Sequence, residues 1–263
     1  MIKFFRKIRQ NLLSEGKTGK YFKYAIGEIV LVVIGILIAL SINNWNEDRK
    51  LNNTERHTLE NLLSEIQLDT LDLSFNLNMH KTSLENSERL FHYLNNNDSI
   101  QVDSINFTEV LGNPVVAILN MSTYSSLINS SPNLISNQEL KKKIFVHYNL
   151  VYTSILEVEN RSAGFKPYDK LLPFFQKYFT VNRNFNKIDF QKNKSKSENY
   201  FDGEYKRTTL YPKNLASLKN DEPFKVTLSE VIYLRSITIS VYEDALERVN
   251  ELCMEIKNEM DKK

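Results

Sequence analysis

Acidic side chains at helical spacing are the first residues in this chain that could do chemistry. Glu65, Asp69 and Asp72 stand at positions i, i+4 and i+7, which places three carboxylates on one face of a predicted helix. Carboxylates grouped in this way can bind a hard cation, which prefers oxygen ligands. We interpret them instead as a solvated acidic face of that helix, with a cation site as the alternative.

Histidine and cysteine are too scattered to predict a metal centre. His57, His80, His92 and His147 show no His-x-x-x-His spacing, and the first three lie too far apart along one helix to meet a single metal. His80 falls on an apolar helical seam, so we expect a packed, hydrogen-bonded histidine there. The single cysteine, Cys253, excludes an internal disulfide, and we expect it to be a small buried hydrophobe.

No motif of a known reaction is present: the sequence lacks the Gly-x-Ser-x-Gly elbow, the P-loop and the dinucleotide-binding fingerprint. The 263 residues include only 7 glycines, and 34 Lys+Arg balance 32 Asp+Glu to a net charge of +2. This charge gives no general attraction for nucleic acid. We therefore expect no cofactor, no metal, no nucleic-acid partner and no enzymatic activity.

One apolar segment predicts a membrane span. Residues 29–42 read IVLVVIGILIALSI without a charge, and Tyr24 and Trp45 bracket them. This bracket is roughly 31 Å long as a helix, about the thickness of the hydrocarbon core of a bilayer. We expect a transmembrane helix over residues 24–45. A buried helix of a soluble domain and a signal peptide cleaved near Ala39 and Ser41 are the alternatives.

The charges around this segment predict its orientation. Residues 1–28 hold seven Lys or Arg, whereas residues 43–62 hold three. The positive-inside rule then predicts a cytoplasmic tail over residues 1–23 and an extracytoplasmic domain over residues 46–263, in the bacterial inner membrane. The opening MIKFFRKIRQNLL is either a helix on an anionic membrane surface or a charge cluster without fixed structure.

Within the span, Glu28, Gly35 and Ala39 lie on one helical face. Small residues four apart allow a second helix to approach closely, and a carboxylate near lipid is least costly against a neighbouring helix. Packing of this face against a second copy of the chain or another membrane protein is one hypothesis. The alternative is that Glu28 extends to the membrane surface and the small residues have no partner.

Two long helices with apolar seams are predicted outside the membrane. The first runs for roughly 45 residues to about Asn95, and its seam is interrupted by Thr70, His80 and Ser87. The second closes the chain between Leu228 and Met260, with Arg235 as the one charged residue of its seam. Two such helices bury their seams most simply against each other, so the fold class is all-α, an antiparallel helical bundle with long first and last helices.

Shorter helices are predicted between them. Thr123 caps a helix through Leu127, a capping box at Ser136 to Glu139 opens one that runs to about Arg161, and another begins near Pro167. We expect residues 180–223 to be irregular. The basic and aromatic stretch at residues 177–207 superficially resembles a nucleic-acid surface, but we interpret it as a solvent-facing loop, with an anionic envelope component as the alternative partner.

Three blocks of sequence stand out: MIKFFRKIR at the start, GEIVLVVIGILIALSINNWNE at Gly27–Glu47 and STYSSLINSSPNLISNQELKKKI at Ser122–Ile144. Together they resemble a family of uncharacterised single-pass bacterial membrane proteins with a basic N-terminus. The resemblance implies a Gram-negative cell envelope and no reaction, because the family is a domain of unknown function. Its members often carry a glycine before the Asn-Leu-Ile stretch, where this chain has Ser131 and Pro132.

The sequence as a whole favours a membrane-anchored envelope protein that acts as a non-enzymatic interaction or scaffold module. The lipid bilayer is one partner, and a second copy or another membrane protein is the other. The alternative is an extracytoplasmic sensor subunit that signals through a separate membrane partner, because long helices leaving a membrane can transmit small shifts in packing.

Overall fold

The computed structural model describes residues 18–96, 102–112, 116–160, 166–181 and 210–262. These residues are mostly helical, with a long apolar helix near the N-terminus and a long helix at the C-terminus, as predicted. The chain divides into two units, Met1–His57 and Thr58–Lys263. Each unit is described by itself.

Unit 1 consists, over its described residues, of the first part of helix α2 (Thr18–Asn95). The sequence has no proline before Pro114, so nothing in it removes a backbone donor from this helix. Every large apolar side chain between Ile26 and Ile42 is exposed, by 45% to 64%. The surface helix predicted for residues 1–13 lies outside the described residues.

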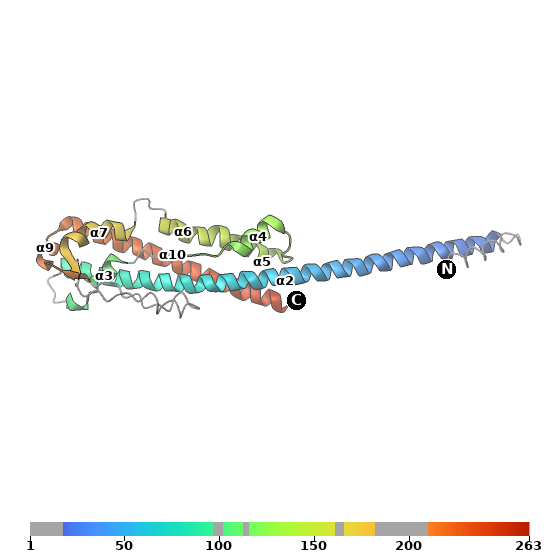
Figure 1. Ribbon diagram of the computed structural model, residues 1–263, viewed down its shortest axis with the longest axis horizontal. Coiled ribbons are helices and arrows are strands. Elements are labelled where there is room, and N and C mark those ends of the chain that lie inside the picture. The colour runs from blue at the N-terminus through green and yellow to red at the C-terminus, as the bar shows by residue number, and fades with distance from the viewer. Residues whose placement is uncertain (1–17, 97–101, 113–115, 161–165, 182–209, 263) are drawn as a thin grey trace. The chain divides into compact units, whose positions relative to one another are not determined.

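Unit 2 contains the rest of α2 and all the other elements (Figure 1). They are η1 (Val102–Ser104), α3 (Phe107–Leu111), α4 (Ser122–Ser130), α5 (Gln138–Val146), the π-helical turn η2 (His147–Val151), α6 (Tyr152–Asn160), α7 (Pro167–Tyr178), β1 (Phe179–Val181), β2 (Leu210–Pro212), α9 (Leu215–Lys219) and α10 (Glu222–Asp261).

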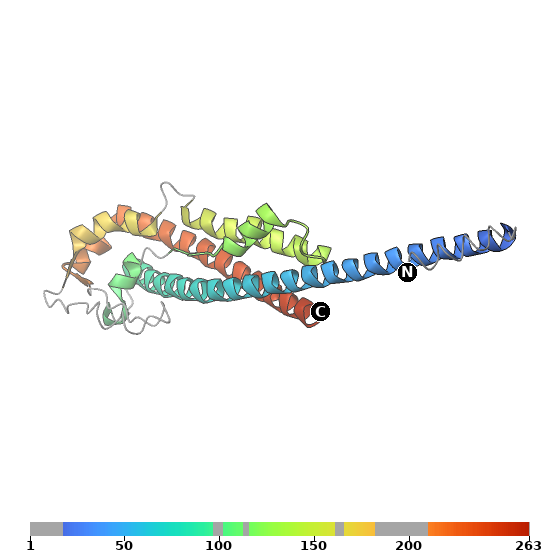
Figure 2. The ribbon, with the colours of Figure 1, turned by 45° about the vertical axis from the view of Figure 1, so that its right-hand side comes forward.

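Helix α10 is the element against which most of the others pack. It contacts α5, η2, α6 and α7, and both ribbon views show α6 and α7 lying along it (Figure 2). It also meets α2, where Lys81 forms an ion pair with Glu243 at 2.6 Å and Arg235 donates a hydrogen bond to Ser87. Because the partner numbers rise on one helix as they fall on the other, the two helices run antiparallel at these contacts.

The helix boundaries follow local signals in the sequence. Asn137 accepts hydrogen bonds from the N–H groups of Glu139 and Leu140 and so caps α5. The capping residue is therefore Asn137, and the prediction of Ser136 as the cap was wrong by one position. The predicted helix at Thr123 is confirmed but begins at Ser122, and the helix predicted at Pro167 begins there.

Residues 180–223 are not wholly irregular, contrary to the prediction. Strands β1 and β2 pair antiparallel, with Phe179 opposite Pro212 and Val181 opposite Leu210. Helix α9 follows, and Asp221 caps α10 by accepting a hydrogen bond from the Phe224 N–H at 3.0 Å. The strands have three residues each, too short for a periodicity of two to be visible in the sequence. Residues 182–209, most of the basic and aromatic stretch, lie outside the described residues.

Two hydrophobic clusters make up the core of unit 2. Cluster A joins α2 and α10 to α4, η2 and the helices next to it, and its buried members are Leu59, Leu62, Ile66, Leu73, Ala117, Tyr124, Leu127, Ile135, Leu140, Ile144, Tyr148, Val151, Tyr152, Ile155, Tyr242, Ala245, Val249, Leu252, Cys253 and Ile256. Cluster B joins them to α3, α7, α9 and the strands, and its buried members are Leu90, Leu94, Ile105, Phe107, Val110, Leu111, Leu171, Phe175, Tyr178, Phe179, Leu218, Phe224, Leu228 and Val231.

Candidate functional site

A layer of polar side chains lies between the two clusters, where α2 and α10 meet. We call His80, Ser83 and Ser87 of α2 together with Arg235 of α10 the polar layer. Three of its members, His80, Ser87 and Arg235, are interruptions of the apolar seams that the sequence predicts. The structure brings these interruptions together, so the polar positions of the two helices match each other.

Arg235 holds this layer together. Its side chain is only 2% exposed, and its guanidinium donates to the Ser83 carbonyl at 3.2 Å, to the Ser87 hydroxyl and to the Leu111 carbonyl at 3.2 Å. Burial lowers the pKa of Arg235 to about 10, so the group stays charged at neutral pH. Within the described ranges, no carboxylate forms an ion pair with it. Hydroxyl and carbonyl dipoles surround the guanidinium, and the negative charge of Glu109 also favours its charged form.

Gly112 allows this contact because it has no side chain. It ends α3 at φ +80°, a left-handed conformation that residues with a side chain rarely adopt. A Cβ atom built at Gly112 would collide with the Arg235 guanidinium. Glycine at this position thus allows the backbone turn. It also lets Arg235 reach the carbonyl of Leu111, which is the last residue of α3.

His80 is packed, as predicted, but its hydrogen bonding within the described residues differs from the expectation. Its ring lies edge-on to Tyr242, with centroids 5.3 Å apart, and its buried Nε2 atom has no hydrogen-bond partner among the described residues. Burial, followed by the positive charge of Arg235, lowers the pKa of His80 to about 4. The imidazole is therefore neutral at physiological pH.

A cavity of about 890 Å³ opens beside the polar layer. Its wall comes from α2, α3, α6, α7 and α10, and includes His80, Ser83 and Arg235. A cavity of roughly 300–1,000 Å³ with an apolar wall and a few polar groups is typical of sites for small organic ligands. This cavity is the candidate functional site.

The three carboxylates of α2 do not form a solvated face, and that interpretation was wrong for two of them. Asp69 is fully buried and Asp72 is 6% exposed. They bind the backbone of residues 116–123, which has no regular secondary structure up to Met121 and then enters the first turn of α4. We call this segment the strap. Asp72 accepts from the Ile118 N–H at 2.8 Å, and Asp69 accepts from the Asn120 N–H at 3.1 Å.

Two further carboxylates complete the attachment of the strap. Glu65 accepts from the Thr123 N–H at 3.2 Å, and Glu159 of α6 accepts from the Ala117 N–H at 2.8 Å and from the Tyr242 hydroxyl. The backbone donors of a segment without a partner strand are satisfied by side chains in this way. Each of these carboxylates binds protein donors, although Glu159 Oε2 has no hydrogen-bond partner among the described residues. No group of three or more metal-ligating side chains occurs in the part of the chain that the structure describes.

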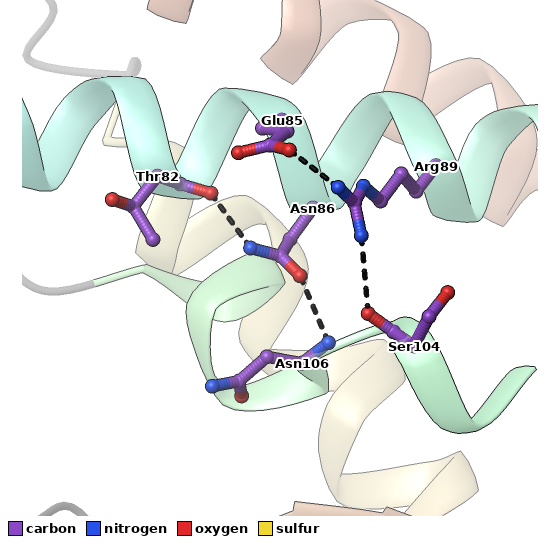
Figure 3. Close-up of polar contacts among 6 residues, drawn as sticks. All are labelled: Thr82, Glu85, Asn86, Arg89, Ser104 and Asn106. Carbon is purple, nitrogen blue, oxygen red and sulfur yellow. Dashed lines mark hydrogen bonds and ion pairs between the residues drawn. The ribbon is translucent and has the colours of Figure 1, made fainter.

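Another segment is attached to α2 by the same means, as Figure 3 shows. Asn86 accepts from the Asn106 N–H at 2.8 Å while its amide donates to the Thr82 carbonyl at 2.9 Å. Arg89 donates to the Ser104 carbonyl at 3.4 Å and to Glu85 at 2.5 Å. These contacts position the turn that leads into α3, and therefore Leu111 and Gly112 at the polar layer.

The turn η2 carries a second buried histidine. His147 is 2% exposed, and neither ring nitrogen has a hydrogen-bond partner in the described residues. Its ring packs on Tyr152 with centroids 4.2 Å apart, and burial lowers its pKa to about 4. It lines a smaller cavity of about 270 Å³ between α5 and α10. π-Helical turns occur often at functional sites, but nothing in the sequence indicated this one.

The residues predicted to form a transmembrane packing face, Glu28, Gly35 and Ala39, all lie on α2 in unit 1. A Cβ atom added at Gly35 would meet nothing within 4 Å, so the structure leaves open space at this face. Their predicted role stays a prediction. Cys253 is buried at 8% exposure, which confirms the expectation for it, and burial raises the pKa of its thiol.

Sequence reasoning missed the strap and the cavity, although a signal for the polar layer was present. Interruptions of two predicted seams by polar residues could have been matched to each other once an antiparallel pairing was assumed. The strap carries no such signal, because its residues show neither helical nor strand periodicity. The cavity exists because the side chains of the surrounding helices do not fill the space between them, and a sequence does not show this.

Comparison with curated proteins and with solved structures gave no match. A family model does match, over the stretch that contains the apolar segment, the three carboxylates of α2, the strap and the Asn137 cap. This agrees with the resemblance found in the sequence. Residues 28–139 of the chain are thus similar to a family of unknown function (DUF6090).

Proposed function

We propose that this chain is a single-pass protein of the bacterial inner membrane, with a cytoplasmic N-terminus and a periplasmic helical domain. The observation that carries the proposal is the apolar surface of α2. An 18-residue window of this helix has a mean hydropathy of 2.8 and is not buried. A soluble protein rarely exposes so large a continuous apolar surface, which argues against the core helix of a soluble domain.

The charge distribution supports the orientation. The seven Lys or Arg of residues 1–28 exceed the three of residues 43–62, and basic residues beside a span stay in the cytoplasm. A cleaved signal sequence has the same composition as an anchor, so the experiment must separate the two.

The periplasmic part acts, in this proposal, as a non-enzymatic interaction module built as an antiparallel helical bundle. The contacts of α2 with α10 and the packing of α5, α6 and α7 on α10 support the bundle. A rigid helical domain on a membrane anchor presents a surface at a defined place in the envelope. The module would then work by binding a partner.

A sensor is the second candidate, and one observation favours it. Helix α2 carries both the apolar segment and three residues of the polar layer, beside which the cavity opens. A ligand that alters packing at this layer would act directly on the helix that enters the membrane. Such a sensor needs a separate membrane partner for its output.

The topology is tested with reporters on the full chain. Alkaline phosphatase, which is active only outside the cytoplasm, is fused after Lys263, and a cytoplasmic fluorescent reporter is fused in a parallel strain. We expect phosphatase activity without fluorescence, and a chain that stays with the membrane after alkaline extraction. A fluorescent fusion would overturn the orientation. If the intact mass shows that the mature chain begins after residue 41, and alkaline extraction releases it from the membrane, the apolar segment is a cleaved signal peptide and not an anchor.

The interaction role is tested by affinity purification from solubilised membranes. The full chain is compared with a chain whose residues 25–42 are replaced by an unrelated membrane span. Partners retained by both chains bind the helical domain, and partners lost on replacement bind the span. Recovery of no specific partner with either chain, together with turnover of a substrate by the purified protein, would overturn the proposal of a non-enzymatic module.

A further inference from the structure

The cavity beside the polar layer has a largely apolar wall that includes the buried charged side chain of Arg235. Apolar side chains line it along α10 and α6, among them Leu234, Val241 and Val158, with the hydroxyls of Ser154 and Thr238 between them. His80, Ser83 and Arg235 also line it and lie close together, since Arg235 donates to the Ser83 carbonyl and its charge acts on His80. A wall of this kind fits a ligand with an apolar body and a single polar group.

The charges around the cavity decide which polar group that is. Arg235 is buried and charged and forms no ion pair within residues 18–96, 102–112, 116–160, 166–181 and 210–262, and the Glu109 carboxylate acts on it only from beyond ion-pair distance. The neutral His80 adds a ring nitrogen without a hydrogen-bond partner. An anion placed there gains a charge-assisted hydrogen bond in a place that water reaches poorly.

The wall also holds acidic residues. Glu159 accepts from Ala117 and from Tyr242, whose ring packs against His80, and its buried Oε2 atom has no hydrogen-bond partner among the described residues. Burial raises the pKa of Glu159, which favours its neutral form. Glu157 and Asp169 are exposed, and Lys166 also lines the wall. Mixed charges at an exposed edge give no net preference for a ligand charge, because solvent screens them. The buried cation of Arg235, with His80 and Ser83 beside it, is thus the place in the wall that favours the anionic group of a ligand.

We propose that this cavity binds an aliphatic monocarboxylic acid, with the carboxylate against His80, Ser83 and Arg235 and the chain along the apolar walls of α6 and α10. The site lies wholly within unit 2. The proposal goes beyond an interaction module and does not depend on the side of the membrane on which unit 2 lies. A failure of the topology test therefore leaves it standing, and the reverse also holds.

The test uses the full chain in phosphatidylcholine nanodiscs. The probe is decanoic acid labelled with ¹³C at the carboxyl carbon, followed by NMR, and protein-free nanodiscs give the signal of the acid dissolved in lipid. We expect an additional carboxyl resonance that saturates at one ligand per chain. Its titration midpoint should lie below that of the lipid-dissolved acid, because a neighbouring guanidinium favours the ionised form. A spectrum identical to that of protein-free nanodiscs would overturn the proposal.

The ligand itself supplies the test of the charged group, without any change to the protein. Decanol has the same chain without the carboxylate. We expect it to displace labelled decanoate at least about tenfold more weakly than unlabelled decanoate does, because a hydrogen bond to a charged group is lost. Equal displacement by decanol would overturn the assignment of Arg235 and His80 to an anion.

Substitutions locate the site. Thr238→Trp and Ser154→Trp each add a large side chain to the cavity from a different helix, and neither removes an Arg235 contact. Each should reduce the extra resonance by at least tenfold. Val226→Trp, at a 68% exposed position on α10 outside the cavity wall, is the matched control and should bind as the native chain does. If a folded Thr238→Trp or Ser154→Trp chain binds with native affinity, the ligand lies elsewhere and the proposal is wrong.

Discussion

Asp69 offers the sharpest test of how the strap is held. Its fully buried carboxylate accepts from the Asn120 N–H at 3.1 Å, from the Asn120 side-chain amide at 2.5 Å and from the Tyr152 hydroxyl at 2.5 Å. In Asp69→Asn, one oxygen replaces two, and the new amide donor faces at least one of these donors. An unsatisfied buried donor costs about 1–3 kcal/mol, so we expect a loss of about 2 kcal/mol. Asp69→Leu leaves all three donors without an acceptor and should cost about 3–5 kcal/mol.

The assay is thermal unfolding of the purified chain in a mild detergent. The tyrosine signal in near-UV circular dichroism reports on this region, since Tyr124 and Tyr148 stack with centroids 4.3 Å apart and Tyr152 bonds Asp69. For a unit of about 200 residues, 2 kcal/mol lowers Tm by about 4–8 °C. Glu88→Gln makes the same acid-to-amide change at an exposed position of α2 and should leave Tm unchanged.

The pH dependence of stability, compared between the native chain and Asp69→Asn, tests the electrostatics of this carboxyl group. Burial raises the pKa of Asp69 above its ordinary value of 3.8, although the hydrogen bonds from Tyr152 and Asn120 oppose the shift. A carboxyl group with a raised pKa binds its proton more tightly in the folded chain, so its contribution to stability grows as pH falls and is lost as pH rises through the folded-state pKa. The advantage of the native chain over Asp69→Asn should therefore be larger at pH 5 than at pH 7. An advantage that grows with pH, or a Tm equal to the native one, would refute this account.

Three further predictions concern other parts of the chain. Gly112→Ala should lower the free energy of unfolding by about 2–4 kcal/mol in the same assay. The reason is that φ +80° is strained for alanine and that its Cβ atom would displace Arg235. A Tm equal to the native value would show that the turn adapts. The ring protons of His80 and His147 should titrate near pH 4 by NMR, and since their pKa is lowered, stability should fall as pH drops from about 6.5 through 4; midpoints near 6.5 would contradict their burial. In membranes, Gly35→Leu should reduce the crosslinking of two copies of the chain by a reagent that does not react with cysteine. A dimer that the substitution leaves unchanged, or the lack of a dimer of the native chain, would count against the packing face.

The long helices could be predicted from the sequence because each has a long apolar seam with few polar interruptions and few helix-breaking residues. The end of α2 at Asn95 and the region of α10 were both recognised in this way. The β1–β2 pair was not, since strands of three residues leave no repeating pattern and their paired residues are 29 to 33 positions apart in sequence.

The carboxylates of α2 show why the candidate site was harder to predict than the fold. From the sequence, Glu65, Asp69 and Asp72 look like a charged face turned to water. Their real partners are backbone N–H groups 46 to 58 residues further along the chain. Any residue except proline supplies such a donor, so the strap contains no side-chain pattern that would pair it with the acids. Arg235 was visible as an anomaly, whereas its acceptors are largely carbonyls, which every residue has.

The strap is fixed through its main chain, and this frees its outward side chains from any duty in folding. Ile118 is 68% exposed and Met121 is 40% exposed, while neighbouring Ala117 is buried. Substitution of these two exposed residues during evolution would alter what this surface recognises. The four carboxylates, Glu65, Asp69, Asp72 and Glu159, would still accept hydrogen bonds from the same backbone N–H groups. The deletion of one strap residue, in contrast, would shift every later N–H group relative to the acids of α2, whose spacing is set by the turns of that helix. The strap should therefore tolerate substitutions far better than a change of length.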